Sequence, residues 1–330
     1  MISEYVRLFK ARGYMKRNLP FLYSWHAYVG YELDLYEAFK KPKTIMEVAK
    51  EHDLKEDLLK RWVEVGGVIG YLKKKSKERY QTVKKFMVPS SKHNPRSTGV
   101  LLKEMMELHI PTLIKYPKMM KTEKKEQFNQ KEHGMVVAQT SSLLEQLAIP
   151  RVMKVMKKAK PNTVVDVGCG SGGYLLKLSQ KFPKASMLGI ELNEDVAEEA
   201  SKNCQKQKQV EIVCEDVHKW SPEDKVDFVM LNNILHYISP DDRTELFKKI
   251  SEWLPPKGTL SVVSPIHNSK HGGQFSSVFN SFFTAFDNLY PLPSEDNLKE
   301  LADAAGLKVE KMQPVIKEGG WYQITFKKLN

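Results

Sequence analysis

The sequence predicts an α/β protein with a mostly parallel sheet in its C-terminal half and a helical N-terminal half. The first observation is a β-branched run, Thr163–Val167, that leads into a glycine-rich turn and then an apolar helical pattern. The second is a series of further short apolar runs at residues 185–191, 210–214, 226–231 and 259–264. The third is charge: Lys and Arg outnumber Asp and Glu by 33 to 17 over residues 1–160, whereas residues 161–330 have 19 against 23. We therefore expect a domain boundary near residue 160.

The turn after the first strand has the composition of a nucleotide-binding loop. Gly168, Gly170 and Gly172 follow the strand, and backbone N–H groups at such a strand-to-helix corner face a ligand. The spacing alone is ambiguous, because Gly168, Gly170 and Gly173 also satisfy the G-x-G-x-x-G pattern of a dinucleotide fold. Asp166 favours another ligand, since a carboxylate there repels a pyrophosphate but suits an ammonium group. The predicted ligand carries both an amine and a nucleoside.

Two more acids follow the next two expected strands. Glu191 lies 19 residues after Gly172, and its two carboxylate oxygens suit the two hydroxyls of a ribose. Asp216 follows the third strand and is a candidate acceptor for an adenine amino group. Leu192 and Val217, next to these acids, are taken with them as candidate cofactor contacts. Three strand ends thus offer three acids.

This arrangement resembles the class I S-adenosylmethionine-dependent methyltransferases. Val164 to Gly172, Glu191 and Asp216 match the first three cofactor motifs of that superfamily in order and spacing. The resemblance implies a Rossmann-like sheet of seven strands with an antiparallel last strand. We count seven expected strands, the last two at residues 307–312 and 321–327. It also implies that S-adenosylmethionine is the cofactor, held by the residues named above.

A histidine follows the fourth expected strand. His236 lies where open α/β sheets bind ligands, and an imidazole that titrates near neutrality suits removal of a proton from a hydroxyl. Here the resemblance narrows to the winged-helix O-methyltransferases of plants and bacteria, whose catalytic histidine matches His236 and whose adenine contact matches Asn232. Tyr237 and Ile238 depart from the Asp-Trp pair usual after that histidine, and Asp287 is a loose candidate for its supporting carboxylate. Hydrogen bonding or packing under a loop is the alternative role.

Candidate acceptor contacts come from two helical segments. Met135 lies in a segment that resembles one meeting substrate and cofactor in this family, with ordinary helix packing as the alternative. Phe279 and Phe283 belong to an aromatic stretch that covers an acceptor pocket or forms a core or dimer stripe at helical spacing. His267 and His271 compete for the role of base. Their i, i+4 spacing could hold a metal on a helix, but no carboxylate motif accompanies them, so no metal site is expected.

The N-terminal half contains a predicted winged helix. Two short helices over residues 44–54 and 55–70 precede a hairpin over residues 70–83, and Thr44 with Glu47 forms a capping box at the first helix. Because the hairpin is rich in lysine, DNA binding is one interpretation. The resemblance implies instead a domain that dimerises and roofs the substrate pocket, so we expect no specific nucleic-acid partner.

The predicted domains are a winged-helix dimerisation domain at residues 1–95, a helical linker with substrate-pocket helices at 96–160, and a cofactor-binding catalytic domain at 161–330. The chain has no opening apolar run of fifteen residues and none of 18 or more later, so we expect a cytoplasmic protein without a membrane partner. Its three cysteines have no metal-ligand spacing, and their odd number argues against a disulfide framework.

Together these observations predict a homodimeric methyltransferase that uses S-adenosylmethionine and acts on a hydroxyl of a small, aromatic secondary metabolite, with His236 as general base. An N-, C- or S-methyltransferase of the same fold is the first alternative, because an amine acceptor needs no strong base. A DNA-binding regulator with a cofactor-sensing domain is the second.

Overall fold

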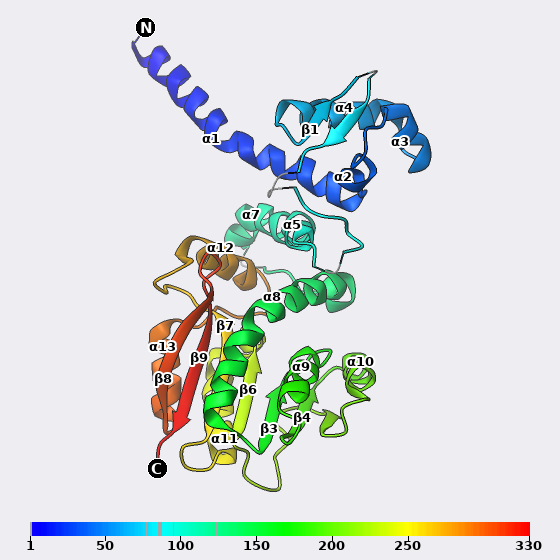
Figure 1. Cartoon of the computed structure of the whole chain (residues 1–330). Helices are drawn as coiled ribbons and strands as arrows, with labels where there is room; N and C mark the ends of the chain where they lie inside the picture. The colour runs from blue at the N-terminus through cyan, green and yellow to red at the C-terminus, as the bar shows by residue number, and fades with distance from the viewer. Residues whose placement is uncertain (1, 77, 85–87, 95, 123) are drawn as a thin grey trace. The chain divides into compact units, whose positions relative to one another are not determined.

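The computed structural model describes residues 2–76, 78–84, 88–94, 96–122 and 124–330 (Figure 1). The chain divides into two compact units, Met1–Pro111 with Met135–Thr140 and Thr112–Gly134 with Ser141–Asn330. Residues 96–160, which the sequence analysis assigns to one linker between the domains 1–95 and 161–330, are therefore divided between both units.

The first unit is helical apart from one small hairpin. Its elements are α1 (Ile2–Glu32), α2 (Leu35–Ala38), α3 (Ile45–Glu51), α4 (Glu56–Val68), β1 (Leu72–Lys74), β2 (Tyr80–Thr82), α5 (Gly99–Glu104) and the π-helical turn η1 (Met105–His109). The strands β1 and β2 pair antiparallel at the place where the sequence predicts a hairpin. The predicted capping box is present, since Glu47 N donates to Thr44 Oγ1 at 3.2 Å and Thr44 N donates to Glu47 Oε2 at 2.7 Å. Arg79, just before β2, donates to both oxygens of Glu47 and so ties the hairpin to α3.

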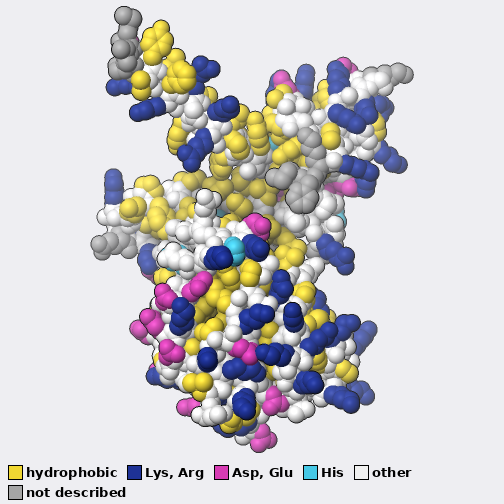
Figure 2. Space-filling view, turned by 60° about the vertical axis from the view of Figure 1, so that its left-hand side comes forward, with side chains coloured by type: hydrophobic (Ala, Val, Ile, Leu, Met, Phe, Trp, Pro, Cys, Tyr) yellow, Lys and Arg dark blue, Asp and Glu magenta, His cyan; other side chains and the backbone are white. Residues whose placement is uncertain are grey.

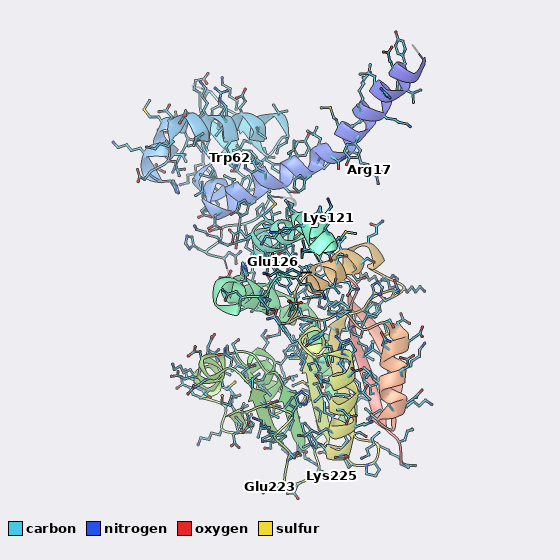
Figure 3. All side chains as sticks on the ribbon, turned by 180° about the vertical axis from the view of Figure 1, so that it is seen from behind. Arg17, Trp62, Lys121, Glu126, Glu223 and Lys225 are labelled. Carbon is cyan, nitrogen blue, oxygen red and sulfur yellow. The ribbon has the colours of Figure 1, made fainter. Side chains whose placement is uncertain are left out.

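The core of the first unit is built on Trp62 of α4 (Figure 3). Trp62 is buried, its indole N–H donates to the carbonyl of His26 at 3.0 Å, and the two rings stack with centroids 4.3 Å apart. Burial lowers the pKa of His26 to about 4, so this ring packs as a neutral group between α1 and α4. The helices α1 and α4 are thereby joined to one another.

The second unit holds a seven-stranded sheet. Its strands are β3 (Thr163–Val167), β4 (Ser186–Glu191), β5 (Val210–Cys214), β6 (Phe228–Asn232), β7 (Thr259–Pro265), β8 (Leu307–Ile316) and β9 (Trp321–Lys328), in the spatial order β5-β4-β3-β6-β7-β9-β8. The first five strands run parallel, and β9 is antiparallel to both β7 and β8. All seven expected strands are confirmed, with β8 four residues longer than the sequence predicts.

Helices cover both faces of this sheet (Figure 1). The helices of the second unit are α7 (Tyr116–Thr122), the part of α8 (Gln130–Ala159) from Ser141, α9 (Gly173–Lys181), α10 (Glu194–Cys204), α11 (Pro240–Trp253), α12 (Gly273–Thr284) and α13 (Glu295–Ala304). The division between the units falls within α6 (Ile110–Ile114), after Pro111. Val164 packs with α8 and α9, whereas Val165 packs with α11 and α13. Because side chains alternate along a strand, Asp166 shares the face of Val164, toward α8.

None of the helices in the described ranges is long and apolar enough to cross a membrane.

Candidate active site

The carboxyl ends of β3 and β6 meet at the centre of the sheet. From these neighbouring strands the chain proceeds to β4 on one side and to β7 on the other. In open α/β sheets such a switch point leaves a crevice that binds ligands. Glu223 and Lys225, in the loop before β6, mark the opposite edge of the sheet (Figure 3). The candidate site therefore lies at the far ends of the strands from these two residues.

The glycine turn after β3 is held close to β4 by backbone hydrogen bonds. Gly168 N and Cys169 N both donate to the carbonyl of Ile190, at 2.8 and 3.0 Å. Gly168 has φ of 66°, and a Cβ there would lie 2.8 Å from Ile234 Cγ2, so a larger residue meets both strain and a clash. At Gly170 a Cβ would meet open space, so the backbone at this residue is accessible. The turn is thus tightly packed at Gly168 and accessible at Gly170, as a ligand-binding turn requires.

Glu191 connects this turn to the end of β4. Its Oε2 accepts from Gly170 N at 3.0 Å and its Oε1 accepts from Asn193 N at 3.1 Å. Each carboxylate oxygen has a second lone pair, so both remain able to accept from another donor. Leu192, the next residue, leaves 71% of its side chain exposed. The structure thus places Glu191 beside the glycine turn, and the cofactor contacts assigned to Glu191 and Leu192 stay predictions.

Asp216 lies in the loop after β5. Its Oδ1 accepts from His218 N at 2.9 Å, and its own N–H donates to Glu215 Oε1 at 2.9 Å. These bonds fix the local loop, while Val217 packs partly against the core of the sheet. The adenine contacts assigned to Asp216 and Val217 stay predictions.

Asp166 is buried at the end of β3 with too few donors around it. Only 1% of the residue is exposed; Oδ1 accepts a long hydrogen bond of 3.3 Å from Asn232 Nδ2, and Oδ2 has no partner. Asn232 Oδ1 and the hydroxyl of Tyr174 are also buried without partners. Burial, with the nearby charge of Glu145, raises the pKa of Asp166 well above its usual value. The arrangement suits a ligand group that carries several N–H donors.

His236 lies in the short 3-10 helix η2 (Leu235–Tyr237) that follows β6. Its ring stacks on Phe283 with centroids 4.3 Å apart, and its Nδ1 is buried without a partner. Burial and the positive charge of Arg243 lower the pKa of His236 to about 3. The expectation that this imidazole titrates near neutrality is therefore wrong for the ligand-free protein, because sequence does not reveal that Phe283 covers the ring.

The structure also places three weaker candidates from the sequence. Asp287 is exposed and its Oδ2 accepts from Gln127 Nε2 at 3.3 Å, so its described hydrogen bond does not lead to His236. His267 and His271 lie before α12, outside any helix, so their spacing does not place them on one helical face. Within the described residues no group of three or more His, Cys, Asp or Glu side chains is arranged to hold a metal.

The aromatic residues of α12 form a wall beside His236. Phe279 and Phe283 have ring centroids 4.4 Å apart, and Phe279 lies 5.4 Å from the ring of Trp321. Phe283 is buried, whereas Phe279 is half-buried. The positions of these two rings are compatible with a role in packing and with contact to an acceptor. Met135 belongs to α8, but its side chain lies outside the described part of the structure.

Comparison with known proteins identifies the domain. Residues 164–258 match a family model described as "Methyltransferase domain". The chain carries a methyltransferase domain. Among curated relatives, a trans-aconitate 2-methyltransferase of Klebsiella pneumoniae (strain 342) is 27% identical over 49% of this chain, and a malonyl-[acyl-carrier protein] O-methyltransferase of Halalkalibacterium halodurans is 28% identical over 31%. The matches span only 53% and 39% of the length of those two relatives.

Solved methyltransferase structures share the fold along nearly the whole chain. Mitomycin 7-O-methyltransferase MmcR is 17% identical with a TM-score of 0.78, covering 98% of this chain and 99% of that one. Human N-acetylserotonin methyltransferase in complex with S-adenosylmethionine is 14% identical with a TM-score of 0.77, covering 99% and 98%. The N,N-8-amino-8-demethyl-D-riboflavin dimethyltransferase RosA of Streptomyces davawensis is 15% identical with a TM-score of 0.74, covering 96% and 99%. The cofactor of the methyltransferase family is S-adenosylmethionine.

The sequence analysis missed three residues that the structure places at or near the candidate site. Tyr174 was assigned only to an apolar helix, and Arg243 to no role, although Arg243 donates to the carbonyls of Leu235 and Ile238 on both sides of His236. Glu145 was also overlooked. A signal for it exists, because it is the only acidic residue between Glu132 and Asp166 in a strongly basic stretch. The other two give no sequence signal, since their roles depend on partners in separate elements.

Proposed function

We propose that this chain is a methyltransferase that transfers a methyl group from S-adenosylmethionine to a hydroxyl of a small aromatic molecule. The observation that carries the proposal is the buried, donor-poor Asp166 carboxylate beside an accessible glycine turn. A dinucleotide pyrophosphate would bring two negative charges toward Asp166, whereas the aminoacyl end of S-adenosylmethionine brings an ammonium group.

The residues at the sheet edge fit the parts of this cofactor. The orphaned Oδ2 of Asp166 and Oδ1 of Asn232 suit an ammonium donor, so in this proposal Asn232 serves the aminoacyl end of the cofactor instead of adenine. The spare lone pairs of Glu191 suit ribose hydroxyls, and exposed Leu192 with Asp216 and Val217 suit adenine. When bound, the cofactor supplies an electrophilic methyl group on a sulfonium.

In the proposed reaction His236 accepts a proton from the acceptor hydroxyl, or a hydrogen bond from it, through one ring nitrogen. Its lowered pKa keeps the ring neutral at physiological pH, so the ring is able to accept. The same lowered pKa makes it a weak base, and binding and alignment then supply most of the rate. Phe279 and Phe283 are the proposed contacts for an aromatic acceptor.

Nitrogen is the second candidate acceptor atom. The weak basicity of His236 favours it, because a neutral amine attacks a sulfonium methyl without losing a proton first. The similarity in fold to a riboflavin-derivative dimethyltransferase is consistent with this alternative. A phenol and an aniline with the same ring skeleton separate the two candidates by their methylation rates.

We also propose that a second copy of the chain covers α1, forming a homodimer in the cytoplasm. Along α1, large apolar side chains alternate with Lys and Arg and remain exposed (Figure 2). Phe9, Tyr14 and Met15 each leave more than 70% of their surface exposed. Soluble monomers rarely expose so many large apolar side chains along one helix. In keeping with a protein partner, we expect DNA binding that is nonspecific and lost at physiological salt.

Calorimetry with S-adenosylhomocysteine and NADH tests the cofactor. We expect saturable binding of S-adenosylhomocysteine and none of NADH; the reverse result would refute the proposed function. Incubation with a deuterated-methyl donor and a panel of phenols and anilines then identifies the acceptor class by the mass of the product. Methylation of anilines but not phenols would contradict the hydroxyl acceptor and support the nitrogen acceptor.

A further inference from the structure

One side of the cofactor site contains a second carboxylate, from α8. Glu145 lies one turn before Ala148 and Ile149 and two turns before Val152, and the side chains of these three residues pack in the core of the sheet. This packing fixes the helix, and therefore the position from which Glu145 extends. Only 14% of the Glu145 side chain is exposed.

The carboxylate of Glu145 lies on the first residue of α9. A Cβ built on Gly173 would be 2.1 Å from Glu145 Oε2 and 2.7 Å from the other two carboxylate atoms. Only glycine therefore leaves room for this carboxylate. One turn later on the same helix, Lys177 Nζ donates to Glu145 Oε1 at 2.5 Å. Glu145 is thus held from two points on α9.

Glu145 is also close enough to act electrostatically on the orphaned groups of the site. Its charge contributes to raising the pKa of both Asp166 and Tyr174, in each case after the larger effect of burial. Asp166 and Asn232 share the sheet face that α8 covers, because they have the same strand parity as Val164 and Met230 in the core beneath α8. Oxygen atoms that accept hydrogen bonds therefore come from four elements, β3, β6, α8 and α9, to the region around Asp166.

This place has acceptors in excess. Asp166 Oδ2, Asn232 Oδ1 and the Tyr174 hydroxyl have no partners, although each of these residues is more than nine-tenths buried. The carboxylates of Glu145 and Asp166 interact in a poorly solvated setting, so they repel each other unless a cation lies between them. Lys177 neutralises Glu145 from one side but makes no described bond to Asp166. A primary ammonium, with three N–H donors and a positive charge, satisfies the remaining oxygens.

We propose that Glu145 is a second carboxylate for the ammonium group of the cofactor's aminoacyl end, and that Gly173 and Lys177 position it. The inference rests on the proposed function and deepens it, because it assigns one group of the cofactor to a residue outside the glycine turn. Glu145 then determines specificity for a nucleoside that carries an amino acid over one that does not.

Two ligands that differ only in this group test the assignment. S-Adenosylhomocysteine carries the amino acid, whereas 5′-methylthioadenosine has the same nucleoside and thioether without it. For Glu145→Gln we expect calorimetry to give about 10- to 100-fold weaker binding of S-adenosylhomocysteine, the range for loss of a hydrogen bond between charged groups. Binding of 5′-methylthioadenosine should stay within about twofold of wild type, since it does not reach Glu145.

Glu310→Gln is the matched control. Glu310 pairs with Lys158 at 2.8 Å, so this variant also removes an ion pair between α8 and another element, but at the far end of the helix. We expect both ligands to bind it as they bind the wild type. Equal losses for the two ligands in Glu145→Gln would mean that Glu145 only supports the fold of the site, and would overturn the inference.

Gly173→Ala provides an independent route to the same result, useful if Glu145→Gln does not fold. The new methyl group displaces the Glu145 carboxylate while suiting a helix, so this variant should also lose affinity for S-adenosylhomocysteine alone. In the double variant the losses should not add, because both changes remove one interaction. Additive losses, or unchanged affinity in the single variants, would refute the role of Glu145. If even the wild type binds neither ligand, the proposed function fails first.

Discussion

Neutralising Asp166 should stabilise the ligand-free protein while destroying its cofactor site. The Asp166→Asn change keeps the size of the side chain and the hydrogen bond from Asn232, but removes a carboxylate that is 1% exposed and has one unpartnered oxygen. The titratable groups facing it are Glu145 from α8, Glu191 from β4, Tyr174 from α9, and Cys169 and Cys204 nearby. None of these brings a positive charge to Asp166.

The direction of the pH dependence follows from the raised pKa of Asp166. The folded protein holds this proton more tightly than the unfolded chain does, so the free energy of unfolding falls as pH rises from the usual aspartate pKa through the raised value. The asparagine variant lacks this dependence. An unsatisfied buried acceptor costs about 1–3 kcal/mol, which corresponds to about 3–10 °C in melting temperature for a unit of this size.

Differential scanning fluorimetry of both proteins between pH 5 and pH 9, without ligand, measures the effect. We expect the variant to melt higher at neutral pH, with a gap that widens as pH rises, and to show no thermal shift with S-adenosylhomocysteine. Asp224→Asn, in an exposed loop, is the control for a simple change of net charge. A variant that melts below the wild type, or a gap that does not vary with pH, would contradict the assignment of an unpaired buried carboxylate.

Three further predictions concern the reaction, the histidine loop and the dimer. His236→Ala should lower kcat on a hydroxyl acceptor by no more than about 10²-fold, because a weak base contributes less than one matched to the reaction pH, and it should not change the affinity for S-adenosylhomocysteine. Because the pKa of His236 is about 3, the wild-type profile of kcat/KM against pH should show no limb from this group near pH 6.5, and a limb there that disappears in the variant would refute the lowered pKa. Arg243→Met leaves the carbonyls of Leu235 and Ile238 without their donor, so it should lower the free energy of unfolding by about 1.5–3 kcal/mol. Urea titration measures this loss, and Arg243→Lys should recover part of it. Equal stability of the wild type and both variants would show that these bonds do not support the loop. Phe9→Glu should convert the dimer to a monomer in light scattering after size exclusion, whereas Lys10→Glu should not; a monomeric wild type would remove the proposed dimer.

The strands and the glycine turn were predictable because their causes are local. A β-branched run such as Thr163–Val167 and the glycines after it determine a buried strand and a turn from adjacent residues alone. Glu191 was predictable for a related reason, since it ends its own strand, and parallel strands bring their carboxyl ends to one edge. The C-terminal end of β8 was not predictable from the sequence, because it depends on how β8 pairs with β9 across a turn.

The sequence by itself determined where the strands lie along the chain and which acids end them, because both follow from periodicity and spacing, and its motifs carried the resemblance that indicates the class of the domain. Only the tertiary structure decided the pKa values of the site residues and which of their atoms are left without a partner. Phe283 and Arg243 come from later elements and make His236 a weak base, and the charge of Glu145, from an earlier helix, contributes to the raised pKa of Asp166. Burial and charge depend on neighbours in space, so protonation and ligand contacts are set by packing that no local pattern records.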